Sequence, residues 1–242
     1  MTRFFITPEQ ISGDSAYISG DDAKHCYVLR LRTGERIVLC DGAGYDYICE
    51  FECGSKDEAR LKVLDKLPSE GEPGTEYCLY CAFPKRDKAE HIIQKATELG
   101  VSVIAFFPSE FCVAKYSGTD LQRKTPRWME IAKEAAQQSA RGKIPEVRAF
   151  GSFTDAIKSA AAAEFPLFCN EREQSRTLKE AVATHSGYKS VSIVTGSEGG
   201  FSVAEAETIK DAGLISVTLG KRILRCETAP LAVLSALTII DS

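Results

Sequence analysis

A glycine-rich stretch, TGSEGGFSVAEAE at residues 195–207, joins a short apolar run to an acidic segment. The run before it, SVSIVTG, is rich in β-branched residues, which is the composition of a buried strand. After it, Ser202 stands three residues before Glu205, the spacing of a capping box that begins a helix. The pattern therefore places Gly199 and Gly200 in a strand-to-helix turn, where open α/β sheets bind ligands against bare backbone.

A second turn of this kind lies at LGKRILRCETA, residues 219–229. Gly220 ends the apolar run ISVTLG, and the last predicted helix begins after this turn. Because consecutive strand ends of a parallel sheet share one edge, the two turns are expected to wall a single pocket. The charged residues of the second turn are Lys221, Arg222, Arg225 and Glu227.

The sequences of these turns do not match several common ligand-binding and catalytic motifs. TGSEGG lacks the GxGxxG spacing of a dinucleotide-binding fingerprint, and the chain contains no GxxxxGK followed by Ser or Thr. No GxSxG motif precedes a histidine, since the last histidine is His185. Nucleotide redox chemistry, ATP hydrolysis and serine hydrolysis are therefore disfavoured.

The cysteines and histidines favour structural roles. Nine cysteines form an odd set in a chain without a secretion signal, so reduced thiols are expected. Cys78 and Cys81 spell CxxC inside the strand-like TEYCLYCAF, where an odd offset sends their side chains to opposite faces. With three scattered histidines, the sequence predicts no metal site.

Composition limits the class of protein. The 242 residues are 44% hydrophobic, enough for one large domain or two small ones. No run reaches the ~20 apolar residues of a membrane-spanning helix, and we expect a soluble cytoplasmic protein. The net charge of −4 leaves only local basic clusters for nucleic-acid contacts. These clusters are Lys24 with Arg30, Arg32 and Arg36, residues 85–88, residues 123–127 and residues 221–225.

The pattern of apolar residues changes near residue 70. Before it, short alternating apolar runs and tight turns predict a β-rich segment, and LPSEGEPGTE at 67–76 has the composition of a linker. From residue 76 onward, strands alternate with helices, which predicts a mainly parallel sheet covered on both faces. The final helix, about 227–240, is apolar nearly all round, so it is either central to the monomer or packed against a second subunit.

Four stretches together resemble one known family. GSEGGFS, LGKRILRCETAPLAVL, IIQKATELGV and RWMEIAKEAAQQSAR are similar to the RsmE family, bacterial 16S ribosomal RNA uridine-N3 methyltransferases of the SPOUT class, and KHCYVLRLRTGE resembles the start of its N-terminal domain. The resemblance implies an RNA-binding PUA-like β-barrel over residues 1–70 and a SPOUT α/β methyltransferase domain with a deep trefoil knot over 71–242. It further implies S-adenosyl-L-methionine as cofactor, the small ribosomal subunit as partner and a homodimer formed through the knot domain.

The resemblance also implies which residues of the loops bind the cofactor. It implies that the cofactor is surrounded by Phe168, Cys169, Asn170, Thr195, Gly196, Glu198, Gly199, Gly200, Leu219, Gly220, Ile223, Leu224 and Arg225. Glycines with Ile or Leu suit an adenine slot, which agrees with this assignment. Ser197 and Lys221 stand where the family usually has proline, and Cys226 where it has threonine. Cys226 is either a nucleophile or, as we favour, a packing thiol, because N3 methylation needs only loss of the N3 proton and in-line attack.

Three charged residues are candidates for that chemistry. Arg225, or Arg222, would stabilise negative charge on the uracil oxygen, and Glu198 or Glu227 would take the proton if partly desolvated. Glu227 as a helix-start charge and the arginines as loop salt bridges are the structural alternatives. Phosphate contacts are expected from Lys24, Arg30, Arg32, Arg222 and the cluster from Lys85 and Arg86 to Lys88.

Two other functions remain open at this point. A noncatalytic RNA-binding protein with a PUA-like module and a degenerate knot would bind RNA without the cofactor. An α/β enzyme that uses another nucleotide would hold a different ligand at the same strand ends.

Overall fold

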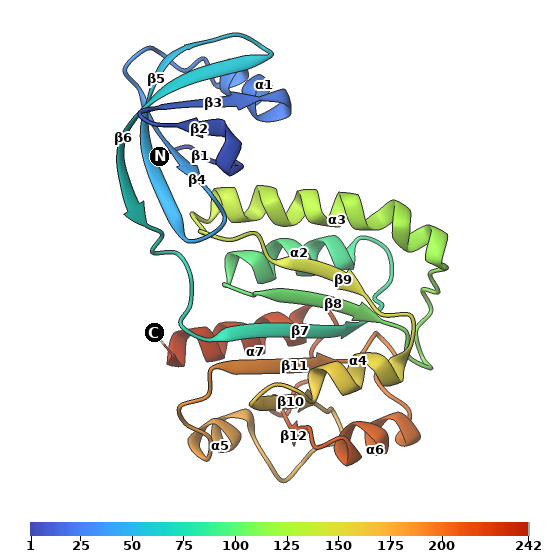
Figure 1. The fold of residues 1–242 in the computed structure, drawn as a ribbon. Helices are drawn as coiled ribbons and strands as arrows, with labels where there is room; N and C mark the ends of the chain where they lie inside the picture. The colour runs from blue at the N-terminus through green and yellow to red at the C-terminus, as the bar shows by residue number, and fades with distance from the viewer. Residues whose placement is uncertain (242) are drawn as a thin grey trace. The chain divides into compact units, whose positions relative to one another are not determined.

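The computed structural model describes residues 1–241, and this chain folds into two compact units. The first comprises residues 1–72 with 136–144, and the second comprises residues 73–135 with the chain from 145 onward (Figure 1). Each unit has its own sheet of six strands. No helix within residues 1–241 is both long and apolar enough to cross a membrane.

The first unit is built on a largely antiparallel sheet with the order β1-β4-β5-β6-β3-β2, in which only β1 and β4 run parallel. Alternation of buried and exposed residues along β3 lets one face of the sheet cover a core that includes Phe4, Ile18, Leu39 and Leu61. Its elements are β1 (Arg3–Phe5), η1 (Pro8–Gln10), β2 (Ile11–Ser12), β3 (Ser15–Ser19), α1 (Gly20–Leu29), β4 (Arg36–Cys40), β5 (Tyr45–Gly54) and β6 (Glu58–Pro68).

Helix α1 is a helix within the segment that the alternating apolar runs predict to be β-rich. It buries only Ala23 and Cys26, while Tyr27, Val28 and Leu29 are exposed. Three consecutive exposed apolar residues give no helical stripe, which explains why the sequence pattern misses this helix. Arg30 ends it in the left-handed region, with φ of 54°.

The predicted linker is ordered where it leaves β6. The Glu72 carboxylate accepts hydrogen bonds from the Arg141 guanidinium at 2.7 Å and from the backbone N–H groups of Gly142 and Lys143 at 2.9 and 3.0 Å. The Arg141 side chain is only 3% exposed. This buried ion pair fixes residues 136–144 within the first unit.

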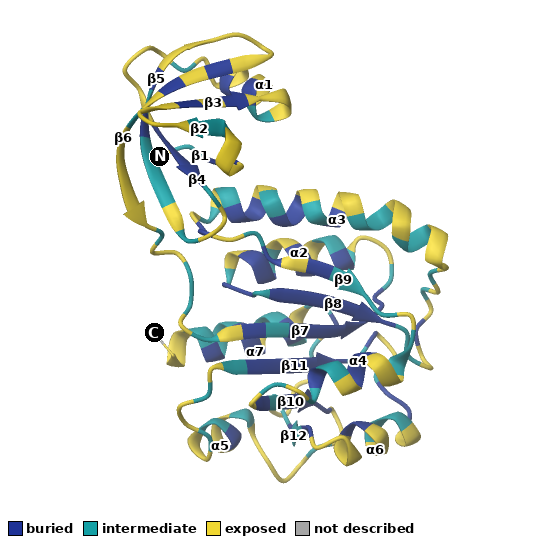
Figure 2. Ribbon diagram, in the orientation of Figure 1, coloured by how far each residue is buried: buried dark blue, intermediate teal, exposed yellow. Residues whose placement is uncertain are grey.

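The second unit is a parallel sheet with the order β12-β10-β11-β7-β8-β9, as the alternation of strands and helices predicts. All five residues of β8 are buried, as expected for a strand covered on both faces (Figure 2). Its elements are β7 (Glu76–Ala82), α2 (Lys88–Glu98), β8 (Val103–Phe107), α3 (Gly118–Gln138), β9 (Glu146–Ala149), α4 (Phe153–Ala160), β10 (Phe165–Cys169), α5 (Leu178–Ala183), β11 (Ser190–Thr195), α6 (Val203–Asp211), β12 (Ile215–Val217) and α7 (Thr228–Ile240).

Helices cover both faces of this sheet. Helix α7 packs on α2 and against β7 and β11, while α4 lies on the opposite face of the same two strands (Figure 1). The buried face of α7 carries Val233, Leu234 and Leu237, but Ile239 and Ile240 are 73% and 57% exposed. Helix α7 is therefore a central helix of its unit that also leaves apolar side chains at its end uncovered.

Candidate functional site

A cavity of about 490 Å³ opens at the carboxyl edge of the parallel sheet. Its walls follow the ends of β10, β11 and β12, three strands that are neighbours in the sheet. The two glycine-bearing turns expected to share a pocket therefore do so. A cavity of this size and position is typical of a site for a nucleotide-sized ligand.

The first wall is the turn after β11. The N–H of Gly200 donates to the carbonyl of Ser197 at 3.0 Å, and Gly200 has φ of 67°, a conformation that favours glycine. A Cβ on Gly196 would lie 3.0 Å from the Cα of Gly200, so the turn closes only without a side chain there. Helix α6 then begins at Val203, with Ser202 as its N-cap. The predicted capping box of Ser202 with Glu205 is confirmed.

The second wall follows β10. Asn170 is 7% exposed; its side-chain amide donates to Ser216 Oγ at 3.2 Å and its side-chain oxygen accepts from the backbone N–H of Arg172 at 3.0 Å. These bonds fix Asn170 between β10 and β12. Glu171 follows it into the cavity wall, close enough that a Cβ on Gly200 would lie 2.3 Å from its carboxylate.

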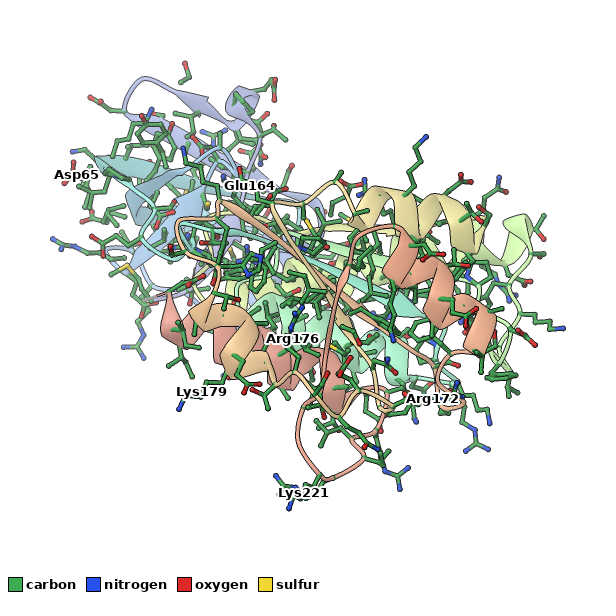
Figure 3. All side chains as sticks on the ribbon, turned by 90° about the horizontal axis from the view of Figure 1, so that it is seen from below. Asp65, Glu164, Arg172, Arg176, Lys179 and Lys221 are labelled. Carbon is green, nitrogen blue, oxygen red and sulfur yellow. The ribbon has the colours of Figure 1, made fainter. Side chains whose placement is uncertain are left out.

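The third wall is the loop after β12, which supplies Leu219, Gly220, Ile223, Leu224 and Arg225. The carbonyl of Arg225 accepts hydrogen bonds at 2.9 Å from the N–H groups of Thr228 and Ala229, which anchors the end of the loop to the start of α7. The neighbouring Lys221 lies at the outer tip of the loop and is exposed (Figure 3).

Lys88, the first residue of α2, joins two of these walls. Its Nζ lies 3.0 Å from Glu198 Oε1 in the first turn and 2.9 Å from Glu227 Oε2 at the start of α7. The three side chains are 27%, 23% and 20% exposed, so water screens them only in part. The backbone N–H of Lys85 donates to the same Glu198 oxygen at 3.1 Å.

The ion pairs change the acidity of all three groups. Burial is the largest single effect and raises the pKa of Glu198 and of Glu227. The hydrogen bonds from Lys88 and from backbone N–H groups, with the charge of Lys88, together outweigh burial, and both carboxyl pKa values fall below their ordinary range. The hydrogen bond to Glu227 has the largest effect on Lys88 and raises its pKa. Burial opposes this effect, the hydrogen bond to Glu198 adds to it, and the pKa of Lys88 is raised overall. At neutral pH the cluster therefore holds one ammonium between two carboxylates.

Cys226 lies against this cluster. Its thiol donates to Glu227 Oε2 at 3.2 Å and is 3.6 Å from Lys88 Nζ, and the residue is 8% exposed. Burial, then the neighbouring carboxylates, raises the pKa of Cys226 to about 12. A thiol that stays protonated at neutral pH is a poor nucleophile, which favours the packing role.

Two family models match this chain. Residues 71–238 match a family described as an RNA methyltransferase domain, and residues 18–64 match an RNA methyltransferase PUA domain. Over 98% of its length the chain is 33% identical to ribosomal RNA small subunit methyltransferase E of Bacillus subtilis, 96% of which is covered. The chain belongs to this family of RNA methyltransferases. The family resemblance and the activity that it implies, RNA methylation, are confirmed.

Further relatives span the whole chain. The methyltransferase E of Mycobacterium bovis is 30% identical over 99% of this chain and 92% of its own. A methyltransferase structure from Legionella pneumophila with bound S-adenosyl-L-methionine has a TM-score of 0.88 at 27% identity, covering 99% of this chain and 97% of its own. The structure of methyltransferase E from Neisseria gonorrhoeae, also with that cofactor, has a TM-score of 0.87 at 29% identity, covering 99% and 98%.

The predicted fold class of this RNA methyltransferase is confirmed. The PUA-like unit and the α/β unit with a parallel sheet both match the expectation. The trefoil knot stays a prediction from the family resemblance.

Most of the predicted cofactor residues line one cavity. The lining includes Cys169, Asn170, Thr195, Gly196, Glu198, Gly199, Gly200, Leu219, Gly220, Ile223, Leu224 and Arg225. Phe168 is fully buried and does not line it, because the strand alternation of β10 turns its ring into the core against Phe201. Arg222 lines the cavity as well, and Glu227 reaches its edge through Lys88.

The other predicted RNA contacts lie elsewhere. Lys24 pairs with Asp21 at 2.7 Å on α1, and Arg30 and Arg32 are exposed beyond the end of that helix. Lys85 and Arg86 follow β7, and Arg86 is exposed. Lys88, expected with them at a phosphate, instead lies in the cavity wall, because two carboxylates from other loops hold it there.

Sequence reasoning missed Lys88 and Glu171 as members of the site. Both follow strands of the parallel sheet, β7 and β10, on the carboxyl side. The position just after a strand end was the available signal for Glu171. Lys88 lies further along, at the start of α2, where a lysine has the pattern of a solvated face.

Proposed function

We propose that this chain transfers the methyl group of S-adenosyl-L-methionine to N3 of a uridine in the 16S RNA of the small ribosomal subunit. The observation that carries the proposal is that two glycine turns and the end of β10, at three adjacent strand ends of an RNA methyltransferase, wall one cavity. The relatives named for small-subunit methylation support the substrate class, and the resemblance to the RsmE family supports uridine N3.

The cavity residues fit the cofactor. Leu219, Ile223 and Leu224 offer apolar surface for adenine, and Glu171 offers a carboxylate for a cationic amine or sulfonium. Gly196, Gly199 and Gly200 line the same cavity, and backbone without side chains lets the ligand approach closely.

The charged residues suit deprotonation of a weakly acidic base. The bound cofactor would supply an electrophilic methyl group on sulfur. The Arg225 guanidinium lines the cavity, where it would stabilise negative charge on a uracil oxygen as N3 loses its proton. Glu198 or Glu227 would accept that proton, and the lowered pKa of each carboxyl makes the arginine the more important of the two effects.

We assign the roles of the two parts along the predicted boundary. Residues 1–70 would bind RNA through Lys24, Arg30 and Arg32, and residues 71–242 would bind the cofactor and perform the transfer. The match of residues 18–64 to an RNA methyltransferase PUA domain supports the first assignment.

We also propose a homodimer formed through the second unit. The exposed Ile239 and Ile240 at the end of α7 would be covered by a second copy. Light scattering of the wild type should give twice the 26.4 kDa chain mass. An Ile239→Glu variant should shift to the monomer mass, and a wild type that scatters as a monomer contradicts the proposal.

Mapping of methylated nucleosides tests the function directly. Mass spectrometry of 16S RNA from cells that lack this protein should show loss of one 3-methyluridine, and the purified wild-type protein should restore it on small subunits. An unchanged nucleoside pattern rejects the substrate. Calorimetry with S-adenosyl-L-methionine separates the proposed function from the two alternatives. A noncatalytic RNA-binding protein and an enzyme for another nucleotide would both release no binding heat.

A further inference from the structure

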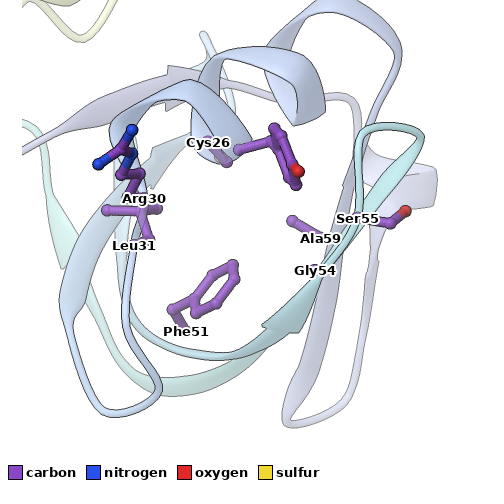
Figure 4. Close-up of a pocket in the computed structure, with 8 residues that line it drawn as sticks. Cys26, Arg30, Leu31, Phe51, Gly54, Ser55 and Ala59 are labelled. Atoms are coloured by element: carbon purple, nitrogen blue, oxygen red, sulfur yellow. The ribbon is translucent and has the colours of Figure 1, made fainter.

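A second cavity, of about 440 Å³, lies in the first unit and has no part in the cofactor site. It opens between the end of α1 and the hairpin of β5 and β6, and Figure 4 shows Arg30 and Leu31 on one side facing Gly54 and Ala59 on the other, with Phe51 below. The lining residues are Cys26, Tyr27, Arg30, Leu31, Phe51, Gly54, Ser55 and Ala59.

The floor of this cavity is apolar and buried. Cys26 and Ala59 are almost fully buried, and Phe51 is 8% exposed. Gly54 keeps space next to the Phe51 ring, because a Cβ there would lie 3.0 Å from the ring edge. The floor therefore presents an apolar surface, on which a flat ligand can lie without leaving polar side chains unpaired.

The rim is aromatic and cationic. Tyr27 is 53% exposed although it lines the cavity, and the Lys56 ammonium lies 5.4 Å from the centre of its ring. Arg30 stands one turn further along, where its backbone N–H donates to the Tyr27 carbonyl at 3.1 Å. Within residues 1–241 the Arg30 guanidinium has no ion-pair partner, so its charge is available to a ligand.

An exposed aromatic ring beside two cations matches the chemistry of an unpaired nucleotide. Bases splayed out of single-stranded RNA stack on aromatic side chains, while Lys and Arg contact the phosphates. Phosphate attraction alone would not hold RNA on this unit, because residues 1–72 and 136–144 together contain 14 acidic and 11 basic residues. A base pocket supplies binding that does not depend on net charge.

We propose that this cavity binds one unpaired base of the RNA substrate, stacked on Tyr27, with the adjoining phosphate between Arg30 and Lys56. All lining residues fall within residues 18–64, the stretch that matches the RNA methyltransferase PUA domain. The proposal rests on the proposed function for its substrate, and it assigns the first unit a base-binding role in addition to phosphate contacts.

Fluorescence of a single-stranded RNA hexamer with one central 2-aminopurine tests the stacking. The wild type should quench this base, and Tyr27→Ala should abolish the quenching and weaken binding about tenfold, the effect of losing one stacked base. Tyr27→Phe should retain both, because the ring remains. Tyr45→Ala is the matched control: Tyr45 is 44% exposed and carries Lys66 over its ring at 4.1 Å, but it does not line the cavity.

Methylation kinetics separate this inference from the proposed function. Tyr27→Ala should raise KM for 16S RNA about tenfold and leave kcat and cofactor affinity unchanged. Equal quenching and equal KM in Tyr27→Ala and the wild type overturn the base pocket alone. Quenching that depends on Tyr27 in a wild type that methylates no RNA overturns the proposed function and leaves the base pocket standing.

Discussion

Lys88 joins two walls of the cavity that we propose for the cofactor. It holds Glu198 and Glu227, from two different walls, within 3.0 Å of one nitrogen. Lys88→Ala would leave two neighbouring carboxylates without a cation, and their repulsion would part the walls. We expect kcat to fall about a hundredfold, the scale of a 1 Å misplacement, as measured with saturating RNA and cofactor.

The same helix provides a control for this variant. Lys95 pairs with Glu98 at 2.8 Å on the exposed side of α2, so Lys95→Ala removes a lysine ion pair without touching the cavity. Its kcat should equal that of the wild type. If both variants lose activity equally, the effect belongs to the helix and the role of Lys88 is wrong.

The ion pairs at Lys88 also predict a pH dependence of stability. The lowered carboxyl pKa values stabilise the folded state above about pH 4.5, the ordinary carboxyl value, and this contribution is lost as pH falls through the lower folded values. The raised pKa of Lys88 contributes below about pH 10.5 and is lost as pH rises through the still higher folded value.

Urea unfolding measures this dependence. The difference in free energy of unfolding between the wild type and Lys88→Ala should stay constant from about pH 7 to 9 and shrink as pH falls. The buried carboxyls of the variant, left without a cation, become neutral first, and those of the wild type become neutral below about pH 4.5. A difference that grows with acidification would show that these pairs do not stabilise the fold.

Cys226 gives a prediction about thiol chemistry. With its pKa raised to about 12, its thiol should resist iodoacetamide at pH 7.5, whereas the exposed Cys53 should react. Mass spectrometry of the alkylated protein reports both sites. Cys226→Ser should also keep methylation within about threefold, because removal of a true nucleophile would lower the rate by orders of magnitude.

At the scale of the site, sequence reasoning located the turns but not the side chains that cross between them. Gly199 and Gly200 were recognisable because a tight turn between strand and helix favours glycine. Lys88 was not, since a lysine at the start of a helix has the pattern of a solvated face until partners from residues 198 and 227 are placed beside it. Such pairs depend on tertiary folding, which local patterns do not encode.

The helices also divide into those that the sequence predicts and one that it does not. Helix α6 begins at the predicted capping box, and α7 lies close to the predicted range because it is apolar nearly all round. Helix α1 has neither feature, so the sequence pattern assigns its ten residues to a β-rich segment. Its buried residues are only Ala23 and Cys26, with the His25 ring edge-on against Phe4, which is too short a signal to predict a helix.

The turn after β11 yields a prediction at this scale. Gly196→Ala would place a Cβ 3.0 Å from the Gly200 backbone, which cannot move aside as a flexible side chain would. Overpacking of this kind costs roughly 1–3 kcal/mol, so we expect about a tenfold loss of cofactor affinity in calorimetry. Gly151→Ala, with nothing within 4 Å of the added Cβ, should bind as the wild type does. Equal affinity in both variants would mean that the turn does not shape the site.

For the whole molecule, two separate cores imply two separate responses to the cofactor. The first unit buries Cys26 and Cys49 and the second buries Cys81, each at 2% exposure or less. The cofactor cavity is lined only by residues of the second unit. A ligand that binds one unit stabilises only the structure that must unfold to release it.

Pulsed alkylation along a urea gradient measures the two units in one sample. S-adenosylhomocysteine at 100 times its Kd should add about 2.7 kcal/mol to the protection of Cys81 and leave Cys26 and Cys49 unchanged. Fluorescence of Trp128, the single tryptophan, buried against Phe106 in the second unit, should shift together with Cys81. Equal added protection at all three cysteines would contradict this prediction, because it would require the units to unfold as one, with the cofactor stabilising the PUA-like unit as strongly as the unit that binds it.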